Sequence, residues 1–235
     1  MPISMMFTQT NSFYENGITI GGQMQMLDQD GLGMSEGEGH LFVDPTDKII
    51  SFDQRELKTY NVDYDHRYET QGFVFERSFK YYFQNFKFRI YHDNNANVLL
   101  VSTKKDIAKS FLNEVSKERK NTKNNKGKLF DFTPIPIDFN QIVAKAENLS
   151  GLWSQVNRGN VHSQAYYGEN INFDEEVQLT LKEKNTSYVL FESNIGGIYQ
   201  KIGITKHGNV VLYNNFESEI QKIKTAFKVY DLFLS

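Results

Sequence analysis

The densest cluster of residues able to do chemistry is Asp63-Tyr64-Asp65-His66-Arg67. Side chains alternate along a strand, so Asp63, Asp65 and Arg67 would share one face and His66 would lie on the other. Two carboxylates on one face can hold a divalent cation for phosphoryl transfer. An exposed strand edge with alternating charges has the same sequence. A metal-dependent nuclease using Asp63, Asp65 and His66 therefore stands as the enzymatic alternative.

A second polar cluster lies in YHDNNANVLLVS, where His92 and Asp93 precede three asparagines. A metal site needs two or three ligands in a compatible frame, usually histidines two apart in a strand or four apart in a helix. Asp and Asn instead favour tight turns, because they tolerate left-handed backbone. We predict a hairpin turn here and no metal site.

The stretch Asn157-Arg158-Gly159-Asn160-Val161-His162 can be interpreted in two ways. Arg158 and His162 could contact an anion, since guanidinium and imidazolium both suit phosphate. A hairpin turn built from Asn and Gly accounts for the same residues without a ligand.

The charge distribution is uneven although the net charge of the chain is only −3. Residues 1–60 hold nine acids and three bases, whereas residues 77–128 hold thirteen bases and four acids. A basic region of this kind suits nucleic acid or an acidic protein surface. The candidate nucleic-acid or anion-binding residues are Lys104, Lys105, Lys109, Lys117, Arg119, Lys120, Lys123, Lys126, Lys128, Arg158 and His162.

Composition narrows the class of protein. The chain of 235 residues is 39% hydrophobic and 14% aromatic, which is enough to bury a core. It has no cysteine, which removes disulfides and thiolate sites and favours the cytoplasm. No apolar run approaches the ~20 residues of a membrane-spanning helix, so we expect no membrane contact.

Hydrophobic periodicity predicts an α+β fold in which antiparallel hairpins are backed by amphipathic helices. Residues 86–118 have the pattern strand, turn, strand, helix, and residues 197–230 repeat it. The repeat favours two related strand-strand-helix subdomains, although chance also explains a match of this length. We predict an acidic, loop-rich N-terminal subdomain over 1–118, a basic linker over 119–133 and a C-terminal subdomain over 134–235.

Two helices are predicted in the C-terminal half. The first begins after Asp138 and ends near Leu149 with Gly151 as its C-cap, and the residues from Gly151 to Gly159 then form a strand. The last helix is capped by Asn215, and its hydrophobic stripe contains Phe216, Ile220, Ile223, Phe227 and Tyr230.

No phosphate-binding GxxxxGK[ST], strand-linked GxGxxG or GxSxG motif is present. We therefore predict a non-enzymatic binding or interaction protein without cofactors, which contacts nucleic acid or an acidic protein surface through the basic region. A third possibility is a structural protein whose aromatic strands form homo-oligomers. The lysine- and asparagine-rich composition suggests a phage, a mobile element or a defence system as the context.

Overall fold

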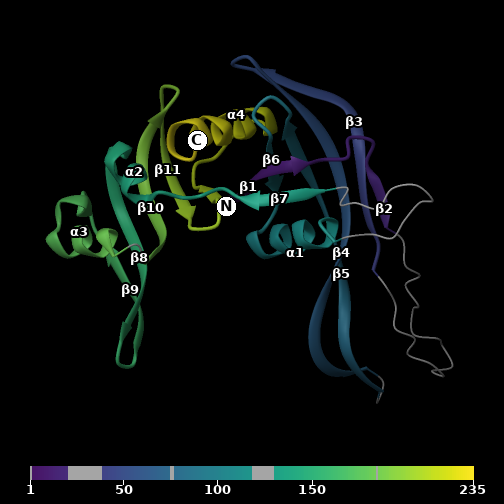
Figure 1. Ribbon diagram of the computed structural model, residues 1–235, viewed down its shortest axis with the longest axis horizontal. Coiled ribbons are helices and arrows are strands. Elements are labelled where there is room, and N and C mark those ends of the chain that lie inside the picture. The colour runs from purple at the N-terminus through teal and green to yellow at the C-terminus, as the bar shows by residue number, and fades with distance from the viewer. Residues whose placement is uncertain (1, 21–38, 75–76, 118–129, 184) are drawn as a thin grey trace. The chain divides into compact units, whose positions relative to one another are not determined.

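The computed structural model describes residues 2–20, 39–74, 77–117, 130–183 and 185–235 (Figure 1). Within these ranges, the side chains of residues 20, 70–74, 77–80, 157 and 158 lie outside the description. The fold is α+β, with antiparallel strands and four α-helices in the described residues, as predicted.

The chain divides into two compact units. The N-terminal unit contains Thr10–Ser102 and Asp106–Phe132, and the C-terminal unit contains Met1–Gln9, Thr103–Lys105 and Thr133–Ser235. The predicted linker lies largely outside the described residues, so the predicted subdomain boundaries stay a prediction.

The N-terminal unit is built on an antiparallel sheet with the strand order β2-β3-β4-β5-β6. The strands are β2 (Ile18–Ile20), β3 (Leu41–Phe52), β4 (Arg55–Val74), β5 (Arg77–Asp93) and β6 (Val98–Ser102). Helix α1 (Lys105–Val115) buries Phe111 against this sheet, with its ring centroid 5.3 Å from Phe88 and 6.1 Å from Tyr64.

The C-terminal unit is built on strands in the order β1-β12-β11-β10-β8-β9. These are β1 (Ile3–Ser12), β8 (Asn148–Arg158), β9 (Val161–Tyr167), β10 (Thr186–Ile195), β11 (Ile198–Thr205) and β12 (Asn209–Leu212), and β7 (Asp131–Pro134) pairs with β1. The helical elements are α2 (Phe139–Lys145), the short 3₁₀ turn η1 (Ile171–Phe173), α3 (Glu175–Lys182) and α4 (Glu219–Phe233).

One face of this second sheet packs on α4, the yellow helix beside β10 and β11 in Figure 1. Val189 and Phe191 of β10 are fully buried on that face, and the Phe191 ring lies 4.8 Å from Phe233 of α4. Near the middle of the helix, the Phe227 ring lies 5.3 Å from Phe7 of β1. Alternation along β10 therefore turns Tyr188, Leu190 and Glu192 to the opposite face.

Several predicted helix ends are displaced. Helix α2 was expected to reach Leu149, with Gly151 as its C-cap, but it ends at Lys145 and β8 begins at Asn148. The last helix is capped by Ser218 and not by Asn215. The Ser218 hydroxyl accepts a hydrogen bond from the backbone N–H of Gln221. Three members of the predicted hydrophobic stripe, Ile223, Phe227 and Tyr230, are buried in α4. Ile220 is 40% exposed and Phe216 precedes the helix, so the stripe is shorter than predicted.

The predicted strand-strand-helix pattern occurs in both units. β5 and β6 form an antiparallel hairpin followed by α1, and β11 and β12 form one followed by α4. Whether the two halves arose by duplication stays a prediction.

Candidate ligand-binding face of the C-terminal sheet

The face of the C-terminal sheet that does not pack on α4 is called the open face here. Strand register places Tyr188 of β10 opposite Trp153 of β8, and Glu192 of β10 opposite Lys201 of β11. Paired residues in an antiparallel sheet point to the same side, so all four side chains belong to the open face. They are only half-buried, unlike Val189 and Phe191 on the packed side.

Four aromatic side chains form a row across this face, which we name the aromatic row. The ring of Trp153 lies 4.8 Å from Tyr167 and 4.9 Å from Tyr188, with an edge-to-face arrangement in both pairs. The Tyr188 hydroxyl lies 3.0 Å from the Tyr213 hydroxyl. Tyr167 is 66% exposed and Tyr213 is 39% exposed, so both ends of the row are open to solvent.

Two glycines allow the rings to lie against the backbone. A β-carbon at Gly151 would come within 2.7 Å of the Trp153 ring, and one at Gly203 would come within 1.9 Å of the Tyr188 hydroxyl. Both distances are far below van der Waals contact, so any side chain at either position would displace a ring. Gly151, which the sequence suggested as a helix cap, instead makes room for Trp153.

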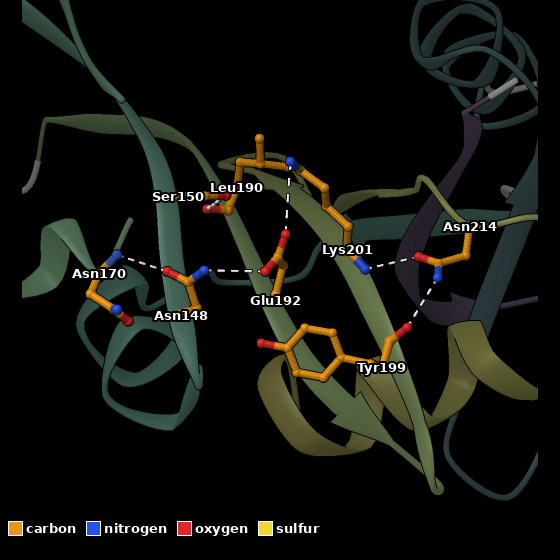
Figure 2. A network of polar contacts seen from close by, with 8 residues as sticks. All are labelled: Asn148, Ser150, Asn170, Leu190, Glu192, Tyr199, Lys201 and Asn214. Atoms are coloured by element: carbon orange, nitrogen blue, oxygen red, sulfur yellow. Dashed lines mark hydrogen bonds and ion pairs between the residues drawn. The ribbon is translucent and has the colours of Figure 1, made fainter. Parts of the chain in front are cut away.

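A polar row of Asn148, Glu192 and Lys201 crosses the same unit (Figure 2). The Asn148 side-chain amide donates to Glu192 Oε2 at 3.1 Å, and Lys201 Nζ lies 3.8 Å from Glu192 Oε1. The Asn148 amide oxygen accepts from the backbone N–H of Asn170 at 2.8 Å. This chain of contacts orients amide, carboxylate and ammonium groups in one line.

A further asparagine continues the network at the edge of β11. The Asn214 side chain accepts from the Lys201 backbone N–H at 2.9 Å and donates to the Tyr199 carbonyl at 3.0 Å (Figure 2). It thereby holds the chain that follows β12 against β11, which places Tyr213 beside Tyr188.

The electrostatics of the open face are close to neutral. Glu192 and Lys201 offset each other, with side chains 25% and 43% exposed. Burial, with the hydrogen bond to Tyr213, raises the pKa of Tyr188 well above its ordinary value. Its hydroxyl is therefore uncharged at neutral pH, and the face offers rings and hydrogen-bonding groups more than net charge.

The predicted basic residues are only partly described. Lys104 is exposed just before α1, Lys105 and Lys109 are half-buried in α1, and Lys117 follows the helix and pairs with Glu114 at 2.5 Å. Arg119, Lys120, Lys123, Lys126 and Lys128 lie outside the described residues.

Arg158 and His162 lie on the β8–β9 hairpin, as the turn interpretation predicted. Arg158 pairs with Val161 across the strands, and Gly159 adopts a positive φ of 60° in the turn. His162 is exposed on β9, and the Arg158 side chain is outside the description. Anion binding at these two residues stays a prediction.

The carboxylates of the proposed nuclease site do lie on one face of β4, but they already have partners. The Asn85 amide donates to both Asp63 and Asp65, at 2.5 and 3.0 Å, and Lys87 Nζ lies 3.2 Å from Asp63. The histidine beside Asp65 is His40, at 2.9 Å, and not the expected His66. His66 lies on the other face, with its ring 4.5 Å from Tyr68, so His66 cannot join the two carboxylates.

His92 and Asp93 end β5, and the predicted hairpin turn follows at residues 94–97. The Asp93 carboxylate accepts from the backbone N–H groups of Asn95 and Ala96 at 3.0 and 3.1 Å and pairs with Arg55. His92 is 3% exposed and stacks on Phe13 at 4.3 Å, and burial lowers its pKa.

The described residues contain no group of three or more His, Asp or Glu side chains placed to hold a metal ion. Among the same residues, none of the helices combines the length and apolar character needed to cross a membrane.

Comparison with known proteins gives no relative: no protein-family model, no curated protein and no solved structure matches this chain. Only the geometry of the open face therefore supports it as a candidate binding site. Sequence reasoning missed it because its members come from four strands. The available signal was Gly151-Leu-Trp153, a glycine and a tryptophan two apart in a predicted strand, which places both on one face.

Proposed function

We propose that this chain is a non-enzymatic binding protein that holds single-stranded nucleic acid across the open face of its C-terminal sheet. The observation that carries the proposal is the aromatic row on a half-exposed sheet face. Exposed aromatic rings bind unpaired bases by stacking, at about 1–3 kcal/mol per base, and tolerate different sequences because every base has a π-face.

The polar row supports the same ligand. Bases that stack on Tyr167 and Trp153 turn their hydrogen-bonding edges toward neighbouring polar groups, and Asn148, Glu192 and Lys201 offer both donors and acceptors there. Lys201 is the only cation of this row, so the open face alone contributes few phosphate contacts.

The basic region supplies the second part of the proposal. Its thirteen bases against four acids suit the phosphate backbone, and Lys104 is exposed within its described part. An acidic protein surface is the alternative partner for the basic region, but base stacking on the aromatic row would not contribute to its binding. We propose the cytoplasm as the compartment, from the absence of cysteine.

Trp153 is the only tryptophan of the chain, so its fluorescence reports directly on the open face. Titration with a labelled single strand of about 15 nucleotides should quench Trp153 and raise the anisotropy of the label together. Tyr167→Ala should weaken binding about 5- to 150-fold, which corresponds to one lost stacking contact. Tyr14→Ala removes a 41% exposed tyrosine of the N-terminal unit and should leave affinity unchanged.

The salt dependence of affinity distinguishes the contribution of the basic region from that of the aromatic row. Replacing Lys120, Lys123 and Lys126 by Gln should make the slope of log affinity against log salt shallower by about 2, whereas Tyr167→Ala should leave the slope unchanged. If no single strand binds at low salt, the proposal is wrong. If binding survives with Trp153 fluorescence unaltered, the open face is not the site.

A further inference from the structure

The carboxylate of Glu192 on the open face is held in place by Asn148. The Asn148 side-chain N–H donates to Glu192 Oε2 at 3.1 Å, and the Asn148 amide oxygen accepts from the backbone N–H of Asn170 at 2.8 Å (Figure 2). The second contact determines which end of the amide faces Glu192, because the amide oxygen needs a donor and a carboxylate has none. Asn148 therefore orients the carboxylate before a ligand binds.

Glu192 can accept further hydrogen bonds. A carboxylate has about four acceptor sites, and within the described residues the Glu192 side chain accepts the one hydrogen bond from Asn148. Lys201 Nζ lies 3.8 Å from Glu192 Oε1, which is an ion pair but too long for a hydrogen bond. The two side chains are 25% and 43% exposed, so a ligand can reach both. A charged acceptor and a charged donor are therefore available next to each other.

An exposed ring lies beside this pair of charged groups. Tyr199 precedes Lys201 by two residues on β11, so both side chains are on the open face. The register makes Tyr199 a diagonal neighbour of Glu192, within reach of an aromatic side chain, and Figure 2 shows its ring next to Glu192. Tyr199 is 51% exposed. A base that stacks on Tyr199 can therefore turn its edge toward Glu192 and Lys201.

We propose that Glu192 and Lys201 recognise guanine in the single strand that the open face binds, an inference that rests on the proposed function. The Watson–Crick edge of guanine presents two adjacent donors, N1–H and N2–H, next to the O6 acceptor. The two donors match the two oxygens of Glu192, and O6 matches the Lys201 ammonium. Hydrogen bonds of this charge-assisted kind are roughly twice as strong as neutral ones.

The other bases do not match this arrangement. Adenine and cytosine present one amino group beside a ring-nitrogen acceptor, and thymine and uracil present one N–H between two carbonyl oxygens. A contact to both oxygens of Glu192 would therefore set an acceptor of these bases against the carboxylate. An arginine of a partner protein also has two adjacent donors, but the Lys201 ammonium beside Glu192 would repel its positive charge.

Labelled strands of about 15 nucleotides that differ in one base test the proposal. In a background of thymidine, a strand with one central guanosine should bind about 5- to 150-fold more tightly than a strand with adenosine there. Adenine is the matched control because both bases are purines that stack on a ring. Inosine lacks the 2-amino group of guanine, so its strand should have an affinity between the other two.

The proposal and the proposed function fail in different ways. Equal affinities for the guanosine and adenosine strands would overturn guanine recognition, while quenching of Trp153 by both strands would leave the proposed function standing. If no strand binds, both are wrong.

Glu192→Gln tests the residue itself. It should remove most of the preference for guanosine over adenosine, because an amide cannot accept from both donors. Glu183→Gln is the matched control: Glu183 is exposed at the end of α3, and α3 contacts Tyr166 on the face opposite to Tyr167. Both variants lose one negative charge, so they should bind the all-thymidine strand alike. A preference that survives in Glu192→Gln would overturn the proposal.

GMP distinguishes a strand from a free nucleotide as the source of guanine. It carries the same base without the neighbouring bases that stack on the aromatic row. GMP should therefore displace the guanosine strand only at concentrations far above that of the strand. Displacement by GMP at an equal concentration would assign Glu192 and Lys201 to a free nucleotide and overturn the proposal.

Discussion

Gly203 is the position at which one methyl group tests the packing of the open face. Its β-carbon would come within 1.9 Å of the Tyr188 hydroxyl and 2.6 Å of the Tyr188 Cζ atom. Gly203→Ala therefore drives the Tyr188 ring off β11 and breaks its 3.0 Å contact with Tyr213. The lost hydrogen bond costs about 1 kcal/mol and the displaced ring about 1–3 kcal/mol, while alanine in a strand returns up to about 1 kcal/mol over glycine. We expect a net loss of about 2 kcal/mol in the free energy of unfolding.

The decisive measurement is a double-mutant cycle with Tyr188→Ala. Once the ring is removed, the methyl group at residue 203 has room, and Gly203→Ala should become neutral or stabilising by about 0.5–1 kcal/mol. The interaction energy should therefore be about 2–3 kcal/mol. Urea unfolding followed by Trp153 fluorescence supplies all four free energies, because Trp153 contacts Tyr188. If the two single losses add to within about 0.5 kcal/mol, the ring does not lie on Gly203 and the argument for the aromatic row is refuted.

Two further predictions concern the N-terminal unit. Arg55→Met leaves the Asp93 carboxylate, 1% exposed, without its cation and should cost about 3 kcal/mol in thermal or urea unfolding. Arg67→Met breaks an exposed pair with Glu69 and should cost less than about 1 kcal/mol; equal losses would contradict the prediction. Burial lowers the pKa of His92, so the unfolded chain binds a proton more readily than the folded one. Stability should therefore be complete above pH ~6.5 and fall as the pH decreases below that value. His92→Phe should flatten this dependence between pH 7 and 5, and an unchanged slope would exclude His92 as its origin.

The fold class was predictable because periodicity reports which face of an element is buried. Ile223, Phe227 and Tyr230 of the predicted α4 stripe are buried as expected, although Ile220 in the first turn of the helix is exposed. Helix ends were less predictable, because several residues near an end can act as caps. Asn215 and Ser218 are both acceptable capping residues, and only the path of the chain after β12 selects Ser218.

The length of the β4–β5 hairpin was not predictable for a different reason. Alternation identified strands around Asp63 and Phe86, but their antiparallel register runs from Leu57 opposite Asp93 to Val74 opposite Arg77. Register is set by pairing across the hairpin, which local sequence does not contain.

The same distinction explains why the polar clusters drew attention and the open face did not. The carboxylates of both polar clusters serve the structure: Asp93 accepts from its own turn, and Asn85 on the neighbouring strand bridges Asp63 and Asp65. A turn concentrates polar residues because its backbone N–H groups need acceptors nearby. The residues of a ligand-binding sheet face are instead dispersed in the sequence, since each strand contributes only every second residue and the strands come from distant segments. Glycines that face aromatic rings are then the informative residues, because a strand interior otherwise disfavours glycine. Gly151 and Gly203 meet that criterion, because a β-carbon at either position would collide with the ring that faces it.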